Sequence, residues 1–326
     1  MPSAIVVREP GGPDVLTFEE STRPDAGPDQ LLVRIAAAGV NFIETYQRSG
    51  AYAVEHPFTP GGEAAGTVEA VGDGVTAFAA GDRVAFAEGT ATYADFAVID
   101  ADRALPVPDG VDLETAAALP LQGMTAHYLI NSTFPVQPEH TVLVHAGAGG
   151  VGLLLIQLLK AKGARVITTV STAEKEELAR GAGADEVLRY EGFADAVKEL
   201  TEGTGVDVVF DGVGRATFDE SLRSLRIRGT LVLFGAASGP VPPLDLQRLN
   251  SGGSLFVTRP KLMDYLLSPE ERRWRSEELF GAVVAGHLNV RIGARYTLAD
   301  AAQAHEDLQA RRTTGKVLLI PDLLTP

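Results

Sequence analysis

The sequence predicts an α/β protein with two domains, one built on a doubly wound parallel sheet and the other on a mainly antiparallel sheet. The chain has 326 residues, which is more than a single hydrophobic core usually serves. Short β-rich pieces fill its first third, and from about Asp112 apolar strands alternate with helices. This change of pattern along the chain predicts the two domain types.

The β-rich first third consists of apolar runs separated by Gly, Pro and Asp turns. The clearest turns are Pro10-Gly11-Gly12-Pro13 and Val71-Gly72-Asp73-Gly74. Closely spaced short runs with such turns favour antiparallel pairing. The expected strands include Leu31–Ile35, Gly66–Val71 and Arg83–Phe86.

The later part predicts a parallel sheet, because each apolar run is followed by a segment with a helical pattern. The expected strands of this sheet are Val142–His145, Arg165–Val170, Val206–Phe210 and Thr230–Phe234, with Ser254–Val257 added at an edge. A helix begins near Glu270, and the chain then returns to strands at Arg291–Tyr296 and Lys316–Ile320 with a helix over Leu298–Arg311 between them.

A glycine-rich turn joins the first of these strands to its helix. Residues 145–152 read HAGAGGVG, so that Gly147, Gly149 and Gly152 form a G-x-G-x-x-G motif between a strand and a helix. In this context the first glycine permits a tight turn, the second lets the backbone approach phosphates, and the third allows close helix packing. The motif predicts a dinucleotide pyrophosphate site at the N-terminus of the helix.

The end of the second strand indicates which dinucleotide is bound. This strand, 164–170, ends at Ser171-Thr172, where NAD-binding proteins carry an acidic residue for the ribose hydroxyls. The missing carboxylate favours NADP, and Lys175 could pair with its 2′-phosphate. Lys175 equally fits a solvated position on a helix, and Glu174, Glu176 and Glu177 reduce the local positive potential, so NAD remains an alternative.

Composition excludes several classes of protein. No apolar run approaches membrane-spanning length, and the N-terminus lacks a secretory signal pattern. The absence of cysteine excludes disulfides and thiolate chemistry. A net charge of −15 disfavours nucleic-acid and anionic-membrane partners. We therefore expect a soluble cytoplasmic protein that acts on a small molecule.

Several ordered motifs resemble the medium-chain dehydrogenase/reductase superfamily, and within it the zinc-independent quinone oxidoreductases related to zeta-crystallin. They extend over nearly the whole chain and comprise Gly39-Val40-Asn41, Pro60–Gly66, Gly81–Val84, Leu121–Ala126, the glycine turn, Asp211–Gly214, Val257–Pro260 and Thr314–Pro321. The resemblance implies a GroES-like catalytic domain (1–125 and 262–326), a Rossmann domain (126–261), and a cleft between the two domains.

Zinc-dependent members of the superfamily differ from this chain in residue type. They carry a Cys ligand ahead of the Asn41 region and a His ligand in a Gly-His-Glu motif, where this chain has Gly62. Catalytic zinc needs three protein ligands. The six histidines show no short-spacing cluster, so we expect no metal site.

Without zinc, the chemistry narrows to soft acceptors. Alcohol oxidation normally needs a Lewis acid or a tuned proton acceptor, whereas a quinone is already electron-poor and yields a delocalised oxyanion. An α,β-unsaturated carbonyl is an equally suitable acceptor. The motifs therefore predict an NADPH-dependent quinone oxidoreductase, with an enone or enal reductase as the alternative. A non-catalytic nucleotide-binding or structural protein is a further possibility.

The resemblance places four residues on the substrate side of the nicotinamide: Asn41, Tyr46, Tyr52 and Thr125. Asn41 would donate an amide hydrogen to a ribose or carbonyl oxygen, with an Asx turn as the alternative role. The tyrosines would stack on a flat ring and donate a phenolic hydrogen bond, or else be ordinary loop aromatics. Thr125 could instead cap the following helix.

The resemblance also implies a wider set of cofactor contacts. Lys175 and Tyr190 would flank the 2′-phosphate, Ser171 would hydrogen-bond to it, and Arg311 would approach from the C-terminal segment. The remaining contacts would come from Asn41, Thr125, Tyr128, Gly147, Gly149, Gly150, Val151, Gly152, Val213, Phe234, Gly235, Ala236, Val257, Thr258 and Arg259. Family members also dimerise through sheet edges, which predicts a homodimer at Ser254–Val257.

Overall fold

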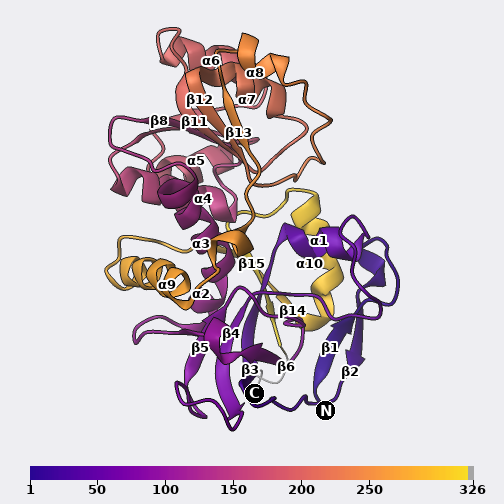
Figure 1. The fold of residues 1–326 in the computed structure, drawn as a ribbon. Helices are drawn as coiled ribbons and strands as arrows, with labels where there is room; N and C mark the ends of the chain where they lie inside the picture. Colours follow the sequence, from indigo (N-terminus) through magenta and orange to yellow (C-terminus); the bar gives the residue numbers. More distant parts are fainter. Residues whose placement is uncertain (322–326) are drawn as a thin grey trace. The chain divides into compact units, whose positions relative to one another are not determined.

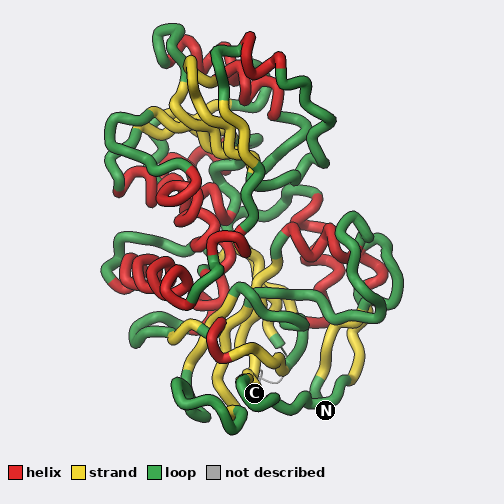
Figure 2. Tube along the Cα trace, in the orientation of Figure 1, coloured by secondary structure: helices red, strands yellow, loops and turns green. Residues whose placement is uncertain are grey.

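The computed structural model describes residues 1–321, and the chain divides into two compact units (Figures 1 and 2). Unit 1 consists of residues 1–124 together with the chain from Leu266 onward, and unit 2 consists of residues 125–265. Helix α3 (Pro120–Tyr128) carries the chain from one unit into the other.

Unit 1 is built around a seven-stranded sheet. Strand β3 (Gln30–Val40) pairs with β15, β4 and β6, and the main path runs β14-β15-β3-β4-β5-β7. Only β14 and β15 pair in parallel, so the expected mainly antiparallel domain is confirmed. The other elements of unit 1 are β1 (Ser3–Val6), β2 (Thr17–Glu20), α1 (Phe42–Arg48), β4 (Ala64–Val71), β5 (Arg83–Phe86), β6 (Phe96–Asp100), β7 (Leu105–Pro106), α2 (Leu113–Ala118), α9 (Pro269–Val284), β14 (Ile292–Thr297), α10 (Ala301–Gln309) and β15 (Lys316–Ile320).

The core of unit 1 lies along β3. Leu31, Val33 and Ile35 are buried at every second position, as expected for one face of a strand. They pack with side chains from both chain ends, among them Val317 of β15 and Ala301 of α10. This shared core explains why residues near the C-terminus complete the N-terminal sheet.

A buried polar cluster joins α1 to α10. The Arg48 guanidinium donates to Gly11 O at 3.2 Å, to His305 Nδ1 at 3.2 Å and to Gln309 Oε1 at 2.9 Å. The other ring nitrogen of His305 contacts the hydroxyl of Tyr93 at 3.0 Å. Because a guanidinium only donates, Nδ1 must accept, so the His305 ring is neutral.

Unit 2 contains a six-stranded sheet in the order β10-β9-β8-β11-β12-β13, and every pair is parallel. Helices cover both faces, with α4 and α5 on one side and α6 and α7 on the other (Figure 1). The elements are β8 (Thr141–Val144), α4 (Gly150–Ala161), β9 (Arg165–Thr169), α5 (Ala173–Gly181), β10 (Glu186–Leu188), α6 (Phe193–Leu200), β11 (Val206–Asp211), α7 (Phe218–Ser224), β12 (Leu225–Leu233), α8 (Gln247–Ser251) and β13 (Phe256–Thr258).

Alternation along the strands of unit 2 divides its core between the two faces. Leu143, Val209 and Leu231 belong to a buried cluster with Phe193 of α6 and Leu222 of α7. The predicted doubly wound sheet is therefore confirmed.

The edge strand β13 begins later than the sequence suggested. It covers Phe256–Thr258, whereas the expected segment was Ser254–Val257. Ser254 has a φ of 57° and ends the turn after α8, so it cannot continue a strand. Within residues 1–321, no helix is long and apolar enough to cross a membrane.

The burial of His305 generates a pH prediction. Desolvation and the nearby Arg48 lower the pKa of His305 to about 3. Its unfolded pKa is about 6.5, so between these values the unfolded chain binds a proton that the folded protein does not. The free energy of unfolding should therefore fall as pH falls through this window, and His305 alone should account for several kcal/mol of the change. His305→Gln should make the free energy of unfolding depend less steeply on pH.

Urea unfolding between about pH 7 and pH 4 measures this slope. His287→Gln is the matched control, because His287 is exposed and should leave the slope unchanged. Equal slopes for His305→Gln and the unmodified protein would show that His305 is not held neutral by burial.

Candidate functional site

The carboxyl ends of the parallel strands form the first candidate region. From β8 the chain proceeds to β9 and β10 on one side, and then returns to β11, β12 and β13 on the other. The loops after β8 and β11 therefore diverge, which creates the topological switch point where doubly wound sheets bind ligands.

The glycine turn lies at this switch point and has the geometry that an anion site needs. Gly149 is the N-cap of α4, and the helix begins at Gly150, so the first-turn N–H groups of Gly150 and Val151 have no partner within the helix. A Cβ at Gly147 would clash with Thr168 Oγ1, and one at Gly152 would clash with Ala146 O. The left-handed residue of the turn is Ala146, with a φ of 56°.

Gly149 has more space around it than the other two glycines. A Cβ there would meet only Ala146, at 3.2 Å from its carbonyl oxygen. The turn and the N-terminus of α4 therefore fit the pyrophosphate of a dinucleotide, with Gly149, Gly150 and Val151 as the residues that would hold it.

The second strand ends as its sequence predicts, with hydroxyl side chains and no carboxylate. β9 stops at Thr169, Ser171 follows in an exposed position, and Thr172 is the N-cap of α5, accepting from Lys175 N at 3.2 Å. Lys175 thus lies in the first turn of α5, four residues after Ser171. Tyr190 follows β10, the neighbouring strand.

The acidic residues around Lys175 are not all free to oppose an anion. Glu176 forms ion pairs with Arg180 at 2.9 Å and Arg189 at 2.8 Å. Hydrogen bonds from these arginines lower the pKa of Glu176. Its negative charge is therefore balanced locally, and Glu174 and Glu177 are the exposed carboxylates that remain.

The other predicted cofactor residues of unit 2 lie at or after the ends of later strands, and Tyr128 is the last residue of α3. Val213 follows β11 and donates its N–H to Asp211 Oδ1 at 2.8 Å. The segment 234–236 follows β12, and the segment 257–259 ends β13. The buried Tyr128 ring stacks on Tyr265, with 4.3 Å between ring centroids. The loops thus lie at the carboxyl ends of the parallel strands, and their contact with a cofactor stays a prediction.

In unit 1, Asn41 is buried and its side-chain amide is already engaged within the protein. Nδ2 donates to Glu63 Oε2 at 3.0 Å, and Oδ1 accepts from Lys316 Nζ at 2.7 Å. Two internal partners fix the orientation of the amide. One N–H of Nδ2 remains for a ligand or for Gly39 O, at 3.5 Å, so a role in binding substrate or ribose stays a prediction.

Glu63 is the centre of this cluster. Its Oε1 accepts from Leu121 N, at the start of α3, at 2.7 Å, and its Oε2 forms an ion pair with Lys316 Nζ. Both charged side chains are almost completely buried. Gly39 is required beside them, because a Cβ there would overlap Glu63 Oε2. The ion pair joins the start of β4 to α1, α3 and β15.

The donor set around Glu63 does not fit a catalytic zinc ion. Zinc takes Cys, His or carboxylate ligands, and here Gly62 precedes Glu63, which is paired with an ammonium group. Among residues 1–321, no group of three or more His, Cys, Asp or Glu side chains could hold a metal. The charge that faces Glu63 is that of Lys316.

Glu44 adds a second buried carboxyl to the cluster. Its Oε2 accepts from Asn41 N at 2.8 Å, and its Oε1 is buried without a hydrogen-bond partner among residues 1–321. Burial raises the pKa of Glu44 to about 7, although the charge of Lys316 opposes the shift. Near neutral pH Glu44 is therefore present in both its protonated and its ionised form.

The two tyrosines of unit 1 lie together at the end of α1. The rings of Tyr46 and Tyr52 are 5.3 Å apart between centroids, and Tyr52 N donates to Tyr46 O at 3.0 Å. Tyr52 is 47% exposed, so its ring is accessible to a ligand. This pairing brings together two of the four predicted substrate-side residues.

Two further predicted residues have positions that the sequence did not anticipate. Thr125 is buried in the interior of α3, so it does not cap a helix. Arg311 follows α10 in unit 1, is exposed, and has a φ of 59°. The predicted approach of Arg311 to a 2′-phosphate stays untested.

Comparison with known proteins identifies the family. Residues 27–109 match the alcohol dehydrogenase GroES-like domain, and residues 150–269 match the zinc-binding dehydrogenase family. A quinone oxidoreductase of Pseudomonas aeruginosa is 46% identical, covering 95% of this chain and 97% of its own. The chain belongs to the quinone oxidoreductase family of the medium-chain dehydrogenases/reductases. The resemblance inferred from the motifs is therefore confirmed.

Two other relatives are informative about ligands and substrates. A mycobacterial structure complexed with NADPH is 54% identical, with a TM-score of 0.96 and coverage of 98% of this chain and 100% of that chain. A 2-haloacrylate reductase from a Burkholderia species is 40% identical, covering 98% of this chain and 99% of its own. The family thus includes members named for different soft acceptors.

Sequence reasoning missed the buried charges of the site. Glu63 and Lys316 both lie in the quoted motifs, but they are 253 residues apart and nothing local pairs them. Glu44 was similarly overlooked, although its place three residues after Asn41 is the spacing of a capping box, an available signal.

The ion pair of unit 1 generates a stability prediction. Lys316→Met leaves the buried Glu63 without a counter-charge, which should cost about 3–5 kcal/mol. Adding Glu63→Gln removes the unpaired charge, so the double variant should recover a large part of this loss. Urea unfolding of the two single variants and the double variant measures the coupling.

Lys261→Met serves as the control, since Lys261 is 69% exposed and contacts Asp264 on the surface. It should change the free energy of unfolding by less than about 1 kcal/mol. Additive losses in the double variant would contradict the ion pair.

Proposed function

We propose that the protein is an NADPH-dependent quinone oxidoreductase that transfers hydride without a metal. The fold and the family are those of oxidoreductases named for quinones. The observation that carries the choice of cofactor is the pair of hydroxyl residues after β9, Ser171 and Thr172, at the position where an acidic residue would select NAD. The NADPH complex of the 54% identical mycobacterial relative supports the same choice.

The protein's own groups would bind the cofactor, orient the quinone and stabilise the negative charge that develops on its oxygen. NADPH supplies the hydride when bound. The N–H groups at the start of α4 would hold the pyrophosphate, and Ser171 and Lys175 would bind the 2′-phosphate. Tyr46 and Tyr52 would stack on the quinone ring, and a phenolic hydroxyl would stabilise the oxyanion that develops on its oxygen. The quinone then takes its proton from solvent or from a nearby group.

Reduction of an enone or enal is the alternative reaction. The 40% identical 2-haloacrylate reductase favours it, because that relative is named for a conjugated acceptor. Both reactions place a developing negative charge on an oxygen conjugated to the carbon that accepts hydride. The same hydroxyl could therefore serve either substrate.

We further propose that the protein acts in the cytoplasm as a homodimer, with neither nucleic acid nor membrane as partner. The net charge of −15 opposes binding to anionic polymers and surfaces. Phe256, on the edge strand β13, is 60% exposed. An uncovered apolar edge favours pairing with a second copy across a two-fold axis.

Parallel assays with a quinone and an enone, each with NADPH, test the reaction. We expect a higher kcat/KM for the quinone than for the enone. Tyr52→Phe should lower the kcat/KM for the quinone by the factor that corresponds to about 1–4 kcal/mol of activation free energy. It should leave the affinity for NADPH within a few-fold. Tyr46→Ala should act mainly on KM. Faster enone turnover would favour the alternative, and unchanged rates in both variants would show that residues 45–52 are structural.

Lys175→Ala tests the 2′-phosphate site. Loss of a charge-assisted contact, worth roughly 1.5–3 kcal/mol, should weaken NADPH binding by about one to two orders of magnitude and change NADH binding little. Titration of each dinucleotide measures this. Lys162→Ala is the control, because Lys162 lies at the opposite end of α4 from the glycine turn. Equal affinity of the unmodified protein for NADPH and NADH would contradict the assignment.

The sheet edge generates a prediction about assembly. Phe256→Lys places a charge in the proposed dimer contact, so it should shift the protein to monomers in sedimentation experiments at micromolar concentration. Ile227→Lys is the matched control for charge on an exposed apolar residue of the neighbouring strand β12. A monomeric unmodified protein would refute the dimer, and loss of the dimer in the control alone would move the contact to β12.

A further inference from the structure

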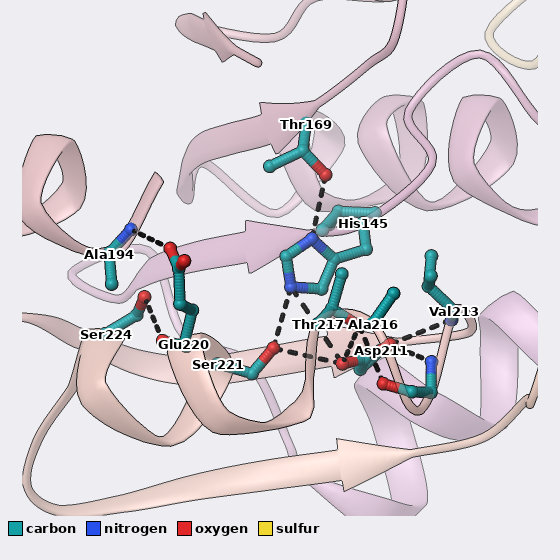
Figure 3. Close-up of polar contacts among 12 residues, drawn as sticks. His145, Thr169, Ala194, Asp211, Val213, Ala216, Thr217, Glu220, Ser221 and Ser224 are labelled. Atoms are coloured by element: carbon teal, nitrogen blue, oxygen red, sulfur yellow. Dashed lines mark hydrogen bonds and ion pairs between the residues drawn. The ribbon is translucent and has the colours of Figure 1, made fainter. Parts of the chain in front are cut away.

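His145 joins three strand ends of unit 2 from a buried position at the switch point. It is the first residue after β8, and its backbone N–H donates to Phe210 O of β11 at 3.1 Å. Its Nδ1 lies 2.7 Å from Thr169 Oγ1, at the end of β9, and its Nε2 lies 2.8 Å from Ser221 Oγ of α7 (Figure 3). The sequence patterns indicated no metal-binding role for this histidine.

The hydrogen-bond chain continues from Ser221 to Asp211, the last residue of β11. Ser221 Oγ donates to Asp211 Oδ2 at 3.0 Å, and Thr217 Oγ1 donates to the same oxygen at 2.7 Å. Asp211 Oδ1 accepts the backbone N–H groups of Val213 at 2.8 Å and Gly214 at 3.0 Å (Figure 3). The carboxylate thereby shapes the loop after β11.

The hydrogen bonds that link Thr169, His145, Ser221 and Asp211 can have only one donor-to-acceptor direction. A carboxylate accepts only, so the single Ser221 proton goes to Asp211, and Ser221 must accept from Nε2–H of His145. Burial lowers the pKa of His145, so the ring is neutral and its Nδ1 accepts the Thr169 hydroxyl proton. Protons therefore point from Thr169 through His145 and Ser221 to Asp211.

Aromatic neighbours fix the plane of the ring. The Tyr190 ring lies nearly parallel to His145, with 6.2 Å between centroids, and Phe193 meets it edge-on at 4.8 Å. Tyr190 is also one of the residues predicted beside the 2′-phosphate. The imidazole thus has a fixed position, a fixed tautomer and contacts toward both sides of the nucleotide site.

We propose that His145 is a positioning residue that holds the loop after β9 and the loop after β11 in register for cofactor binding. This proposal rests on the proposed function. Through Thr169 it orients the segment that leads to Ser171 and Lys175, which in the proposed function would bind the 2′-phosphate that distinguishes NADPH from NADH. Through Ser221 and Asp211 it orients Val213, which in the proposed function would contact the part that both dinucleotides share.

Mutation of the Thr169 contact and mutation of the Ser221 contact should change cofactor binding in different ways. Thr169→Val should raise the Kd of NADPH about fivefold or more, the factor expected for loss of one hydrogen bond, and raise the Kd of NADH less. Thr169→Ser restores the hydroxyl and should restore the Kd. Ser221→Ala should raise both Kd values by similar factors.

Ser224→Ala is the matched control for Ser221→Ala. Ser224 lies one turn later on α7, is equally buried, and its hydroxyl donates to the helix carbonyl of Glu220 at 2.8 Å. It should leave both Kd values within about twofold. Thermal unfolding of each variant shows whether a change in Kd reflects loss of folded protein.

Nitrogen NMR of isotope-labelled histidine in the unmodified, ligand-free protein provides a readout independent of the cofactor. We expect the signal of a neutral ring protonated at Nε2. A ring protonated at Nδ1, or a cation near neutral pH, would overturn the proposal, as would Ser221→Ala behaving like Ser224→Ala while the unmodified protein binds NADPH. Failure of the unmodified protein to bind either dinucleotide would instead refute the proposed function, and the positioning role with it.

Discussion

The buried ion pair between Glu63 and Lys316 is the interaction on which the arrangement of unit 1 depends. One carboxylate receives the ammonium group of β15, the Asn41 amide at the start of α1, and the Leu121 N–H at the start of α3. A buried charge without such partners is strongly unfavourable. The segments that carry the substrate-side candidates are thus tied to a single charged group.

Unit 2 uses a carboxylate in a similar way, although its partners are neutral. Asp211 accepts hydrogen bonds from two backbone N–H groups and two hydroxyls, and His145 connects it to the end of β9. In both units a buried carboxylate at one end of a central strand fixes the neighbouring loops. Tyr52 and Ser171, which would touch ligands in the proposed function, are exposed.

The fold could largely be predicted from the sequence, because it follows local patterns. Apolar runs located five of the six strands of the parallel sheet but not the short edge strand β10, and the glycine turn located the start of α4. The edge strand was misplaced because the left-handed conformation of Ser254 leaves no mark in a hydrophobic pattern. The site was predicted less completely, since the pairing of Glu63 with Lys316 and of His145 with Ser221 joins residues far apart in sequence. Such pairs become visible only when the chain is folded.

In the proposed function the Lys316 ammonium provides the positive charge beside Glu63, and hydride transfer to a quinone needs no metal. Dialysis against a strong chelator, followed by metal analysis and an assay with NADPH and a quinone, tests it most directly. We expect substoichiometric zinc and an unchanged rate. A loss of activity that added zinc restores would contradict it.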